Sequence, residues 1–174
     1  MELPSILRHV VSASLLDVDF FNRAEADTSL NLQAGVVVVI ASGAAGIGSA
    51  IATDANLAAA AALSAVTGVI GWLLWSYVAM AVGTRVFKGT SDFGQMRRVI
   101  GFAYAPLAIG VIPWLGLIGA IWVLFAAVIA IREGMEFSTK RSVATMAVGW
   151  GVWLLATVAV NLLLGWDVRS SWPI

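Results

Sequence analysis

Glu133 and Glu136 form the closest pair of carboxylates after residue 30, and two neighbouring carboxylates could serve as acid and base. Basic residues lie close to this pair in the sequence. If a helix continues past Gly134, Arg132 lies four residues before Glu136 and Lys140 lies four residues after it. Opposite charges at this spacing form ion pairs on a helix surface. The pattern therefore favours a ladder of salt bridges over a catalytic pair.

Other residue types that support catalysis or metal binding are scarce. The chain has no cysteine, which excludes disulfides, thiolate metal sites and a cysteine nucleophile. Its single histidine, His9, cannot form a zinc or haem site alone, so we expect an interfacial helix residue. The fragment Gly46-Ile-Gly48 lies in an apolar segment with no preceding strand, which favours helix packing over a nucleotide loop. We therefore expect a non-enzymatic protein with no cofactor and no metal.

Charged residues gather in two polar stretches whose positions could form a rim that contacts anionic lipid or a partner. A basic residue near a membrane surface attracts anionic lipid by about 1 kcal/mol. The alternative interpretation is that these charges only set the topology of the chain. The predicted rim consists of Arg85, Lys88, Arg97, Arg98, Arg132, Glu133, Glu136, Lys140 and Arg141.

A second candidate site is a polar seam within the apolar part of the chain. Proline-interrupted helices mark substrate sites in transporters, and Pro106 is expected to break a helix. Against a conduit, no acidic or basic residue lies deep in any predicted span, whereas ion and proton pathways usually contain one. The alternative is a proline kink that only serves helix packing. The predicted seam consists of Trp75, Phe102, Tyr104, Pro106 and Asn161.

Transmembrane helices are the elements that must position these residues. Of the 174 residues, 60% are hydrophobic and 11% are charged, and the mean hydropathy is +0.93. Soluble domains contain about 25% charged residues, so the composition indicates an integral membrane protein. The formal net charge is zero, which gives no reason to expect nucleic acid as a partner.

The hydrophobic pattern predicts an all-α, polytopic membrane protein with five transmembrane helices and an N-terminal interfacial helix. The first, second and fifth spans cover residues 30–52, 61–86 and 142–164. Small residues recur on one face of each of the first two spans, for example at Ser42 and Gly46. Such faces allow a second helix to approach closely within a membrane.

The third and fourth spans share the uncharged stretch 99–131, which is too long for one span and short for two. We expect Thr90 or Ser91 to cap the third helix, and Pro106 to break it. We expect Pro113 to turn the chain into the fourth helix. The same stretch could instead form a re-entrant hairpin whose ends return to one side.

An amphipathic segment precedes the spans. Residues 4–16 place apolar side chains at helical spacing, which is typical of a helix in the headgroup plane. Residues 17–27 continue as a polar helix with Phe20 and Phe21 as interfacial anchors. No long apolar core occurs in residues 1–33, so we expect no cleaved signal peptide. The predicted domains are an N-terminal segment, a membrane domain and a short tail, at 1–29, 30–165 and 166–174.

The distribution of positive charge predicts the orientation of the chain. With five spans and a cytoplasmic N-terminus, nine of the ten Lys and Arg residues lie on the cytoplasmic side, and Arg169 lies on the other. The positive-inside rule favours such an arrangement. The C-terminus is therefore expected on the opposite side of the membrane.

Several motifs resemble the Yip family of membrane proteins. The likeness covers about residues 30–165, and its most specific part is the Gly-Phe-Ala-Tyr-Ala-Pro stretch that follows a double arginine. Members are five-span proteins named for interaction with Rab-type GTPases, so the resemblance implies an all-helical domain with a cytoplasmic N-terminus. In its short N-terminal segment the chain resembles the bacterial branch of the family. The resemblance implies no catalytic residues. The motifs are Gly83-Thr-Arg-Val-Phe-Lys-Gly, Phe93, Arg97-Arg98-Val-Ile-Gly-Phe-Ala-Tyr-Ala-Pro106, Ile112-Pro113, Arg132-Glu133 and Ser138-Thr-Lys-Arg141.

These patterns lead to the hypothesis of a membrane-organising or interaction protein, acting as an adaptor or accessory subunit in the bacterial inner membrane. Its expected partners are the lipid bilayer, including anionic lipid, and a second copy or a larger membrane complex. Nucleic acid is not an expected partner. The alternative is a small-solute or ion transporter that uses the third helix, broken at Pro106.

Overall fold

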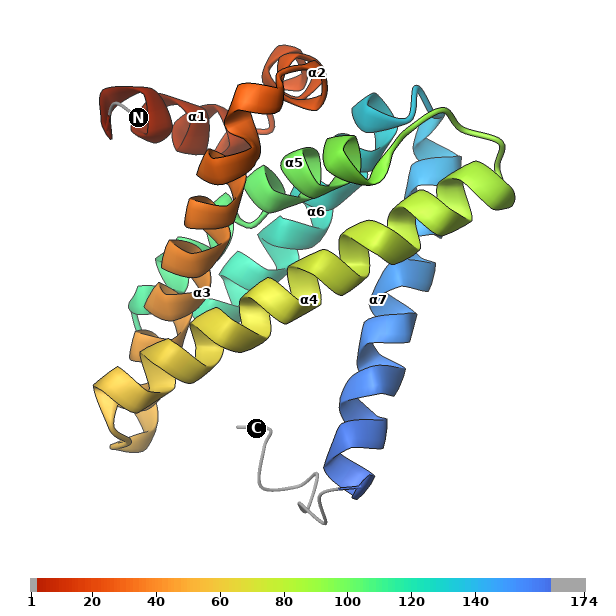
Figure 1. The fold of residues 1–174 in the computed structure, drawn as a ribbon. Helices are drawn as coiled ribbons and strands as arrows, with labels where there is room; N and C mark the ends of the chain where they lie inside the picture. Colours follow the sequence, from red (N-terminus) through yellow and green to blue (C-terminus); the bar gives the residue numbers. More distant parts are fainter. Residues whose placement is uncertain (1–2, 164–174) are drawn as a thin grey trace.

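The computed structural model describes residues 3–163, and this part of the chain is all-helical, as predicted (Figure 1). The long helices run alongside one another, and the two short N-terminal helices lie across one end of them. The elements are α1 (Leu3–Ser14), α2 (Val18–Ala26), η1 (Thr28–Leu30), α3 (Asn31–Thr53), α4 (Leu57–Arg85), α5 (Phe93–Ala103), η2 (Ala105–Val111), α6 (Gly116–Gly134) and α7 (Thr139–Leu163).

Within the described residues, three helices are long and apolar enough to cross a membrane. They are Thr28–Thr53, which joins η1 to α3, Leu57–Arg85 (α4) and Gly116–Gly134 (α6). The protein is therefore a membrane protein with several candidate spans. The predicted fifth span, 142–164, falls on α7, which packs against α4 and α6. The predicted tail at 166–174 lies outside the described residues.

Local capping sets the boundary between the first two spans. Asp54 has a left-handed backbone (φ 53°), and the Ala55 amide donates to the Ala50 carbonyl, which closes the end of α3. The Asn56 side chain accepts a hydrogen bond from the Ala59 amide at 2.9 Å. Because Asn56 is a good N-cap, α4 begins at Leu57, earlier than the predicted start of this span.

Small residues allow α3 and α4 to pack closely, as predicted. A Cβ added to Gly46 would lie 2.5 Å from the Ser64 Oγ, and one added to Gly68 would lie 2.1 Å from the Ser42 Oγ. Neither contact leaves room for a larger side chain. In a membrane, where apolar surface gains little from leaving lipid, such backbone proximity is a main source of helix association.

Prolines shape the segment between α4 and α6. As predicted, Pro106 ends α5 at Ala103, and the chain continues as the 3₁₀ helix η2 before turning at Pro113. Proline has no amide to donate and its ring clashes with the preceding turn, so an α-helix cannot continue there. The cap of α5 is Asp92, not Thr90 or Ser91. Its side chain accepts from the Gln95 amide while the Gln95 side chain accepts from the Asp92 amide.

The N-terminal segment packs on the membrane helices. α2 contacts α5 and α6, and α1 contacts α5 and η2. Phe20 and Phe21, predicted as interfacial anchors, are buried in the core, and the Phe20 ring lies 5.0 Å from the Phe102 ring. The prediction fails because α2 covers the ends of α5 and α6, which offer Phe20 and Phe21 a protein surface in place of lipid.

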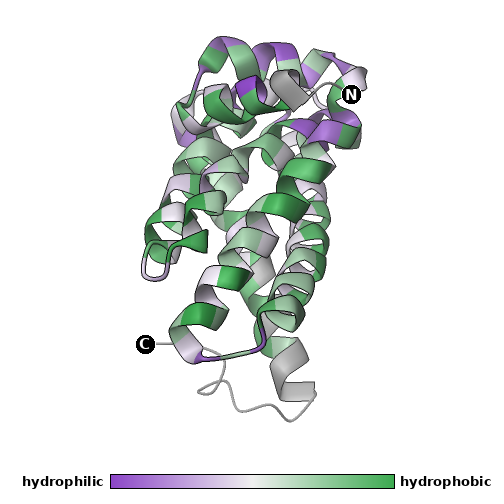
Figure 2. Ribbon diagram, turned by 90° about the vertical axis from the view of Figure 1, so that its left-hand side faces the viewer, coloured by the Kyte–Doolittle hydropathy of each residue, from purple (hydrophilic) through white to green (hydrophobic). Residues whose placement is uncertain are grey.

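Hydrophilic residues gather at one end of the molecule, and apolar residues cover its length (Figure 2). This polar end contains α1, α2 and the loops that follow α4 and α6. The α3–α4 turn lies at the other end. The molecule thus has the polarity expected of a bundle that stands across a bilayer.

Candidate functional site

Arg98 is buried beneath the N-terminal segment. Only 4% of its surface is accessible, and its Nε donates to the Ala24 carbonyl at 3.1 Å. A terminal nitrogen of the same side chain donates to the Glu25 carbonyl. α2 ends at Ala26, so these last-turn carbonyls have no amide partner within the helix. Arg98 therefore caps α2 and is buried, whereas the sequence placed it in the rim predicted to contact lipid or a partner.

Arg97 lies beside Arg98 and shares an acceptor with it. One terminal nitrogen of Arg97 donates to the Asn31 Oδ1 at 3.1 Å, and one of Arg98 reaches the same oxygen at 3.3 Å. The Arg97 guanidinium also lies 5.8 Å from the centroid of the Phe93 ring. Its Nε is buried and has no hydrogen-bond partner in the part of the chain that the structure describes. Two cations thus share one neutral oxygen.

The backbone at Arg97 is held by Trp72 of α4, whose Nε1 donates to the Arg97 carbonyl at 2.8 Å. Gly101 of α5 lies where α3, α4 and α5 pack together. A Cβ added to Gly101 would lie 2.9 Å from the Ala34 Cβ of α3 and 3.1 Å from the Trp72 Nε1. The position of Arg97 is therefore fixed by α3, α4 and α5 together.

Three carboxylates interact across the contact between α2 and α6. Burial raises the pKa of Glu25, and the negative charges of Glu136 and Glu133 raise it further, while the positive charge of Arg98 acts in the opposite direction. The Glu25 carboxylate reaches the end of α6, since its Oε2 would lie 3.8 Å from a Cβ at Gly134. Protonation of Glu25 therefore favours the contact between α2 and α6.

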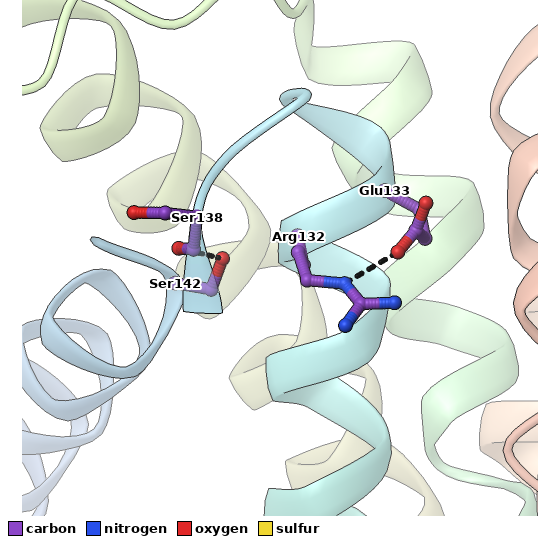
Figure 3. A network of polar contacts seen from close by, with 4 residues as sticks. All are labelled: Arg132, Glu133, Ser138 and Ser142. Atoms are coloured by element: carbon purple, nitrogen blue, oxygen red, sulfur yellow. Dashed lines mark hydrogen bonds and ion pairs between the residues drawn. The ribbon is translucent and has the colours of Figure 1, made fainter. Parts of the chain in front are cut away.

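The predicted ladder through Glu136 does not form. α6 ends at Gly134, and Glu136 has a left-handed backbone (φ 52°) while the Phe137 amide donates to the Arg132 carbonyl at 2.9 Å. This helix ending directs Glu136 away from the helix surface that the ladder requires. Arg132 instead donates to the Glu133 Oε1 at 2.5 Å (Figure 3). In the same figure, the Ser142 hydroxyl donates to the Ser138 carbonyl and closes the first turn of α7.

Four residues of the predicted rim are exposed at the polar end and make no salt bridge among the described residues. Glu136 is also exposed, whereas Arg132 and Glu133 are half-buried. The four exposed basic residues, called the basic patch below, are Arg85, Lys88, Lys140 and Arg141.

The predicted polar seam is assembled only in part. The Trp75 and Tyr104 rings lie 6.4 Å apart, so these two residues do meet. Pro106 is buried at the start of η2. Phe102 packs instead with the N-terminal aromatic residues, where the His9 ring lies 6.0 Å from it. The side chain of Asn161 lies outside the described residues.

Three buried polar atoms on α4 and α7, one of them on Trp75 of the predicted seam, have no hydrogen-bond partner among the described residues. Among the described side chains, Trp75 Nε1, Ser76 Oγ and Thr145 Oγ1 are buried and accept or donate no hydrogen bond. Trp75 lies at the contact between α4 and α7, because a Cβ added to Gly149 would lie 2.4 Å from its ring. Thr145 is one turn from Gly149 on α7. Buried polar groups usually have partners, so this group of three is unusual.

Sequence patterns do not single out Asn31 or Glu25 as members of a site. They also do not predict the partner of His9, whose Nδ1 lies 2.8 Å from the Gln33 Oε1. One usable signal exists for Arg98. A short helix that ends at Ala26 with no glycine after it leaves free carbonyls, and a distant arginine can satisfy them.

Comparison with known proteins gives one match. A family model described as Yip1 domain matches residues 17–161, which include every element from α2 to α6 and most of α7. No curated protein and no solved structure gives a match. The match covers the residues on which the resemblance rests.

Proposed function

Because the chain belongs to the Yip1 domain family, we propose that it is an interaction protein of the membrane, which binds a partner at its polar end and catalyses no reaction. The observation that carries this proposal is the basic patch, whose four side chains are exposed and unpaired among the described residues. A cluster of cations without internal partners favours association with an acidic surface. The expected partner is therefore a membrane or cytosolic chain with an acidic face.

Contacts between two loops support a preformed patch. A Cβ added to Gly89 would lie 2.5 Å from the Phe137 ring, and the Phe87 and Phe137 rings lie 6.1 Å apart. The loop that carries Lys88 therefore packs on the loop that precedes Lys140. A surface held in this way loses little conformational freedom on binding.

The state of the carboxylates supports binding in place of catalysis. Glu133 accepts a hydrogen bond from Arg132, and Glu136 is exposed on a loop. A catalytic pair would need both groups at one substrate position. The ion pair and the loop give these residues a structural role.

We propose that the chain crosses a bacterial inner membrane five times. Its N-terminus then lies on the cytoplasmic side. η2 supports a full third crossing, because a Cβ added to Gly48 would lie 1.9 Å from the Gly110 carbonyl oxygen, close to the end of α3 at Thr53. α5 and η2 have 11 and 7 residues, which correspond to about 16 Å and 14 Å of rise. Their sum is close to the thickness of a bilayer core, about 30 Å.

Crosslinking in native membranes, followed by purification of the full chain in mild detergent, tests the proposal. We compare the wild type with the double variant Lys88→Gln/Lys140→Gln. The matched control is Arg8→Gln/Arg23→Gln, which removes two exposed charges from the N-terminal segment. We expect a partner that is recovered with the wild type and the control and is lost with the patch variant. Equal recovery with both variants would contradict the role of the patch.

A conduit for a small solute is the second candidate function. The observation that favours it is the set of buried, unpartnered polar atoms on Trp75, Ser76 and Thr145, of which Trp75 lies 6.4 Å from Tyr104 at the end of the helix broken at Pro106. Flux of small solutes into vesicles that contain the purified chain is the test. Flux that falls in Ser76→Ala/Thr145→Val would favour the conduit, and vesicles as tight as protein-free ones would exclude it.

A further inference from the structure

An apolar groove runs along the outer surface where α3 and α4 meet. It has a volume of about 340 Å³. Gly35 provides its floor, and a Cβ there would lie 3.7 Å from the Trp72 ring, so the absent side chain leaves the groove open. Leu32 and Val39 are exposed on its α3 side. The lining residues include Leu32, Gly35, Val36, Val39, Val69 and Trp72.

The cation Arg97, which has no carboxylate partner among the described residues, lies near the Asn31 end of this groove. Asn31, which binds Arg97, lies one helical turn before Gly35 on α3, and Trp72, which lines the groove, donates to the Arg97 carbonyl. Arg97 has no carboxylate partner among the residues described. Its Nε is buried without a hydrogen bond, and it shares the Asn31 oxygen with Arg98. An anion would supply the acceptor that the Arg97 guanidinium lacks.

We propose that one phospholipid with a net negative headgroup binds at this position. Its phosphate accepts hydrogen bonds from Arg97, and one acyl chain lies in the groove over Gly35. From Leu32 to Val39 the groove follows eight residues of α3, or about 10 Å of helix rise. The site is separate from the basic patch and does not rest on the proposed interaction with a partner chain.

The position of the groove selects a lipid over other anionic ligands. α3 and α4 are both candidate spans, so the groove opens toward the bilayer and not toward water. The lining atoms are almost entirely apolar, so a peptide would leave its backbone groups without partners there. Arg97 is the fifth residue of α5, one turn after the polar loop that ends at Asp92, so the proposed site places the phosphate near the headgroups. A ligand that joins one phosphate to a hydrocarbon chain satisfies both parts of the site.

Native mass spectrometry of the full chain with defined lipids tests this inference. We titrate the wild type with phosphatidylglycerol, and with phosphatidylcholine as a zwitterionic comparison. We expect one phosphatidylglycerol to be retained more tightly than phosphatidylcholine. Arg97→Gln should raise the apparent Kd for phosphatidylglycerol by about five- to tenfold, and Arg97→Lys should raise it less. Arg8→Gln removes an exposed charge from α1, outside the basic patch, and should leave the Kd unchanged.

A groove-filling variant tests the acyl-chain contact. Gly35→Leu places a side chain in the groove and should abolish retention of the lipid, whereas Ala62→Leu on the exposed surface of α4 should not. If Gly35→Leu lowers the thermal midpoint, Val39→Trp fills the same groove from a residue that already faces outward. An unchanged Kd for phosphatidylglycerol in Arg97→Gln, or retention of this lipid in a stable groove-filling variant, would overturn the proposal. Equally tight binding of glycerol phosphate would also overturn it, because that ligand has no acyl chain.

Discussion

Arg98 of α5 donates a hydrogen bond to the carbonyl of Ala24 at the end of α2, across 3.1 Å and 74 residues of sequence. The bond holds the N-terminal segment against the membrane helices. It also satisfies a carbonyl that α2 itself cannot pair, because the helix ends two residues later at Ala26. This buried arginine thus adds a polar link between α2 and α5 to the apolar contacts of the N-terminal helices.

Arg98→Ala should release α2 from α5. The substitution leaves the carbonyls of Ala24 and Glu25 without donors, and we expect the free energy of unfolding to fall by about 2 kcal/mol. Limited proteolysis should then cut the segment before α3. Thermal unfolding and digestion of the purified chain measure the two effects, with Arg85→Ala as the control because Arg85 is exposed. Intact α2 in Arg98→Ala would show that other contacts suffice.

Glu25→Gln should make the contact between α2 and α6 less dependent on pH. The raised pKa of Glu25 means that the folded state holds its proton more tightly than the unfolded chain. The stability contributed by this group is therefore present at low pH and is lost as the pH rises through the raised pKa. At about pH 8 the wild type should unfold at a lower temperature than Glu25→Gln, and at about pH 5 the two should approach one another.

Thermal unfolding of both proteins at these two pH values measures the difference. The expected shift is modest because the Glu25 carboxyl is only partly buried. Glu133, Glu136 and Arg98 face this group and are unchanged in both proteins, so the two proteins differ only in the ionisable group at residue 25. A difference that is the same at both pH values would contradict the electrostatic cause.

Local chemistry allowed much of the fold to be predicted from the sequence. The ends of α3 and α4 follow from a polar turn between apolar stretches, and the break at Pro106 follows from the missing amide of proline. These features depend on residues close in the sequence. The Pro113 turn was predicted for the same reason, and the chain does turn there.

The direction of Arg97 and Arg98 could not be predicted in this way. The two residues are adjacent on one helix, so one side chain must lie about 100° around the axis from the other. Which of them is buried depends on α2, whose free carbonyls accept from Arg98. The packing of α2 on α5 and α6 also buries Phe20 and Phe21, which a polar helix alone would leave at the interface. The candidate site is therefore a product of tertiary packing.

Cysteine labelling should distinguish five spans from a re-entrant hairpin. Trp114, in the turn after η2, is 86% exposed, and the chain has no native cysteine to give a background. We expect Trp114→Cys to react with an impermeant maleimide added to intact cells. Ser91→Cys and Thr139→Cys, at the polar end, should react only after permeabilisation. Protection of Trp114→Cys in intact cells would show that residues 99–131 return without crossing.

Gly48→Ala should disrupt the contact between α3 and η2. The added Cβ would lie 1.9 Å from the Gly110 carbonyl oxygen and 2.9 Å from that of Val111, and backbone atoms cannot move aside as a flexible side chain can. We expect a loss of about 1–3 kcal/mol in the free energy of unfolding, as for other overpacked sites. Unfolding of the purified chain in mixed micelles of increasing denaturing detergent measures this loss.

Gly43→Ala on the same helix is the matched control for this prediction. Its Cβ would lie 3.7 Å from the Ala61 carbonyl oxygen, an ordinary contact, so the better helix propensity of alanine should stabilise α3 by about 0.5–1 kcal/mol. The two substitutions are chemically identical and differ only in what the new methyl group meets. Opposite signs would therefore assign the loss in Gly48→Ala to the packing of η2. A loss of equal size in both variants would place its cause in α3 itself and would remove this support for a third full crossing.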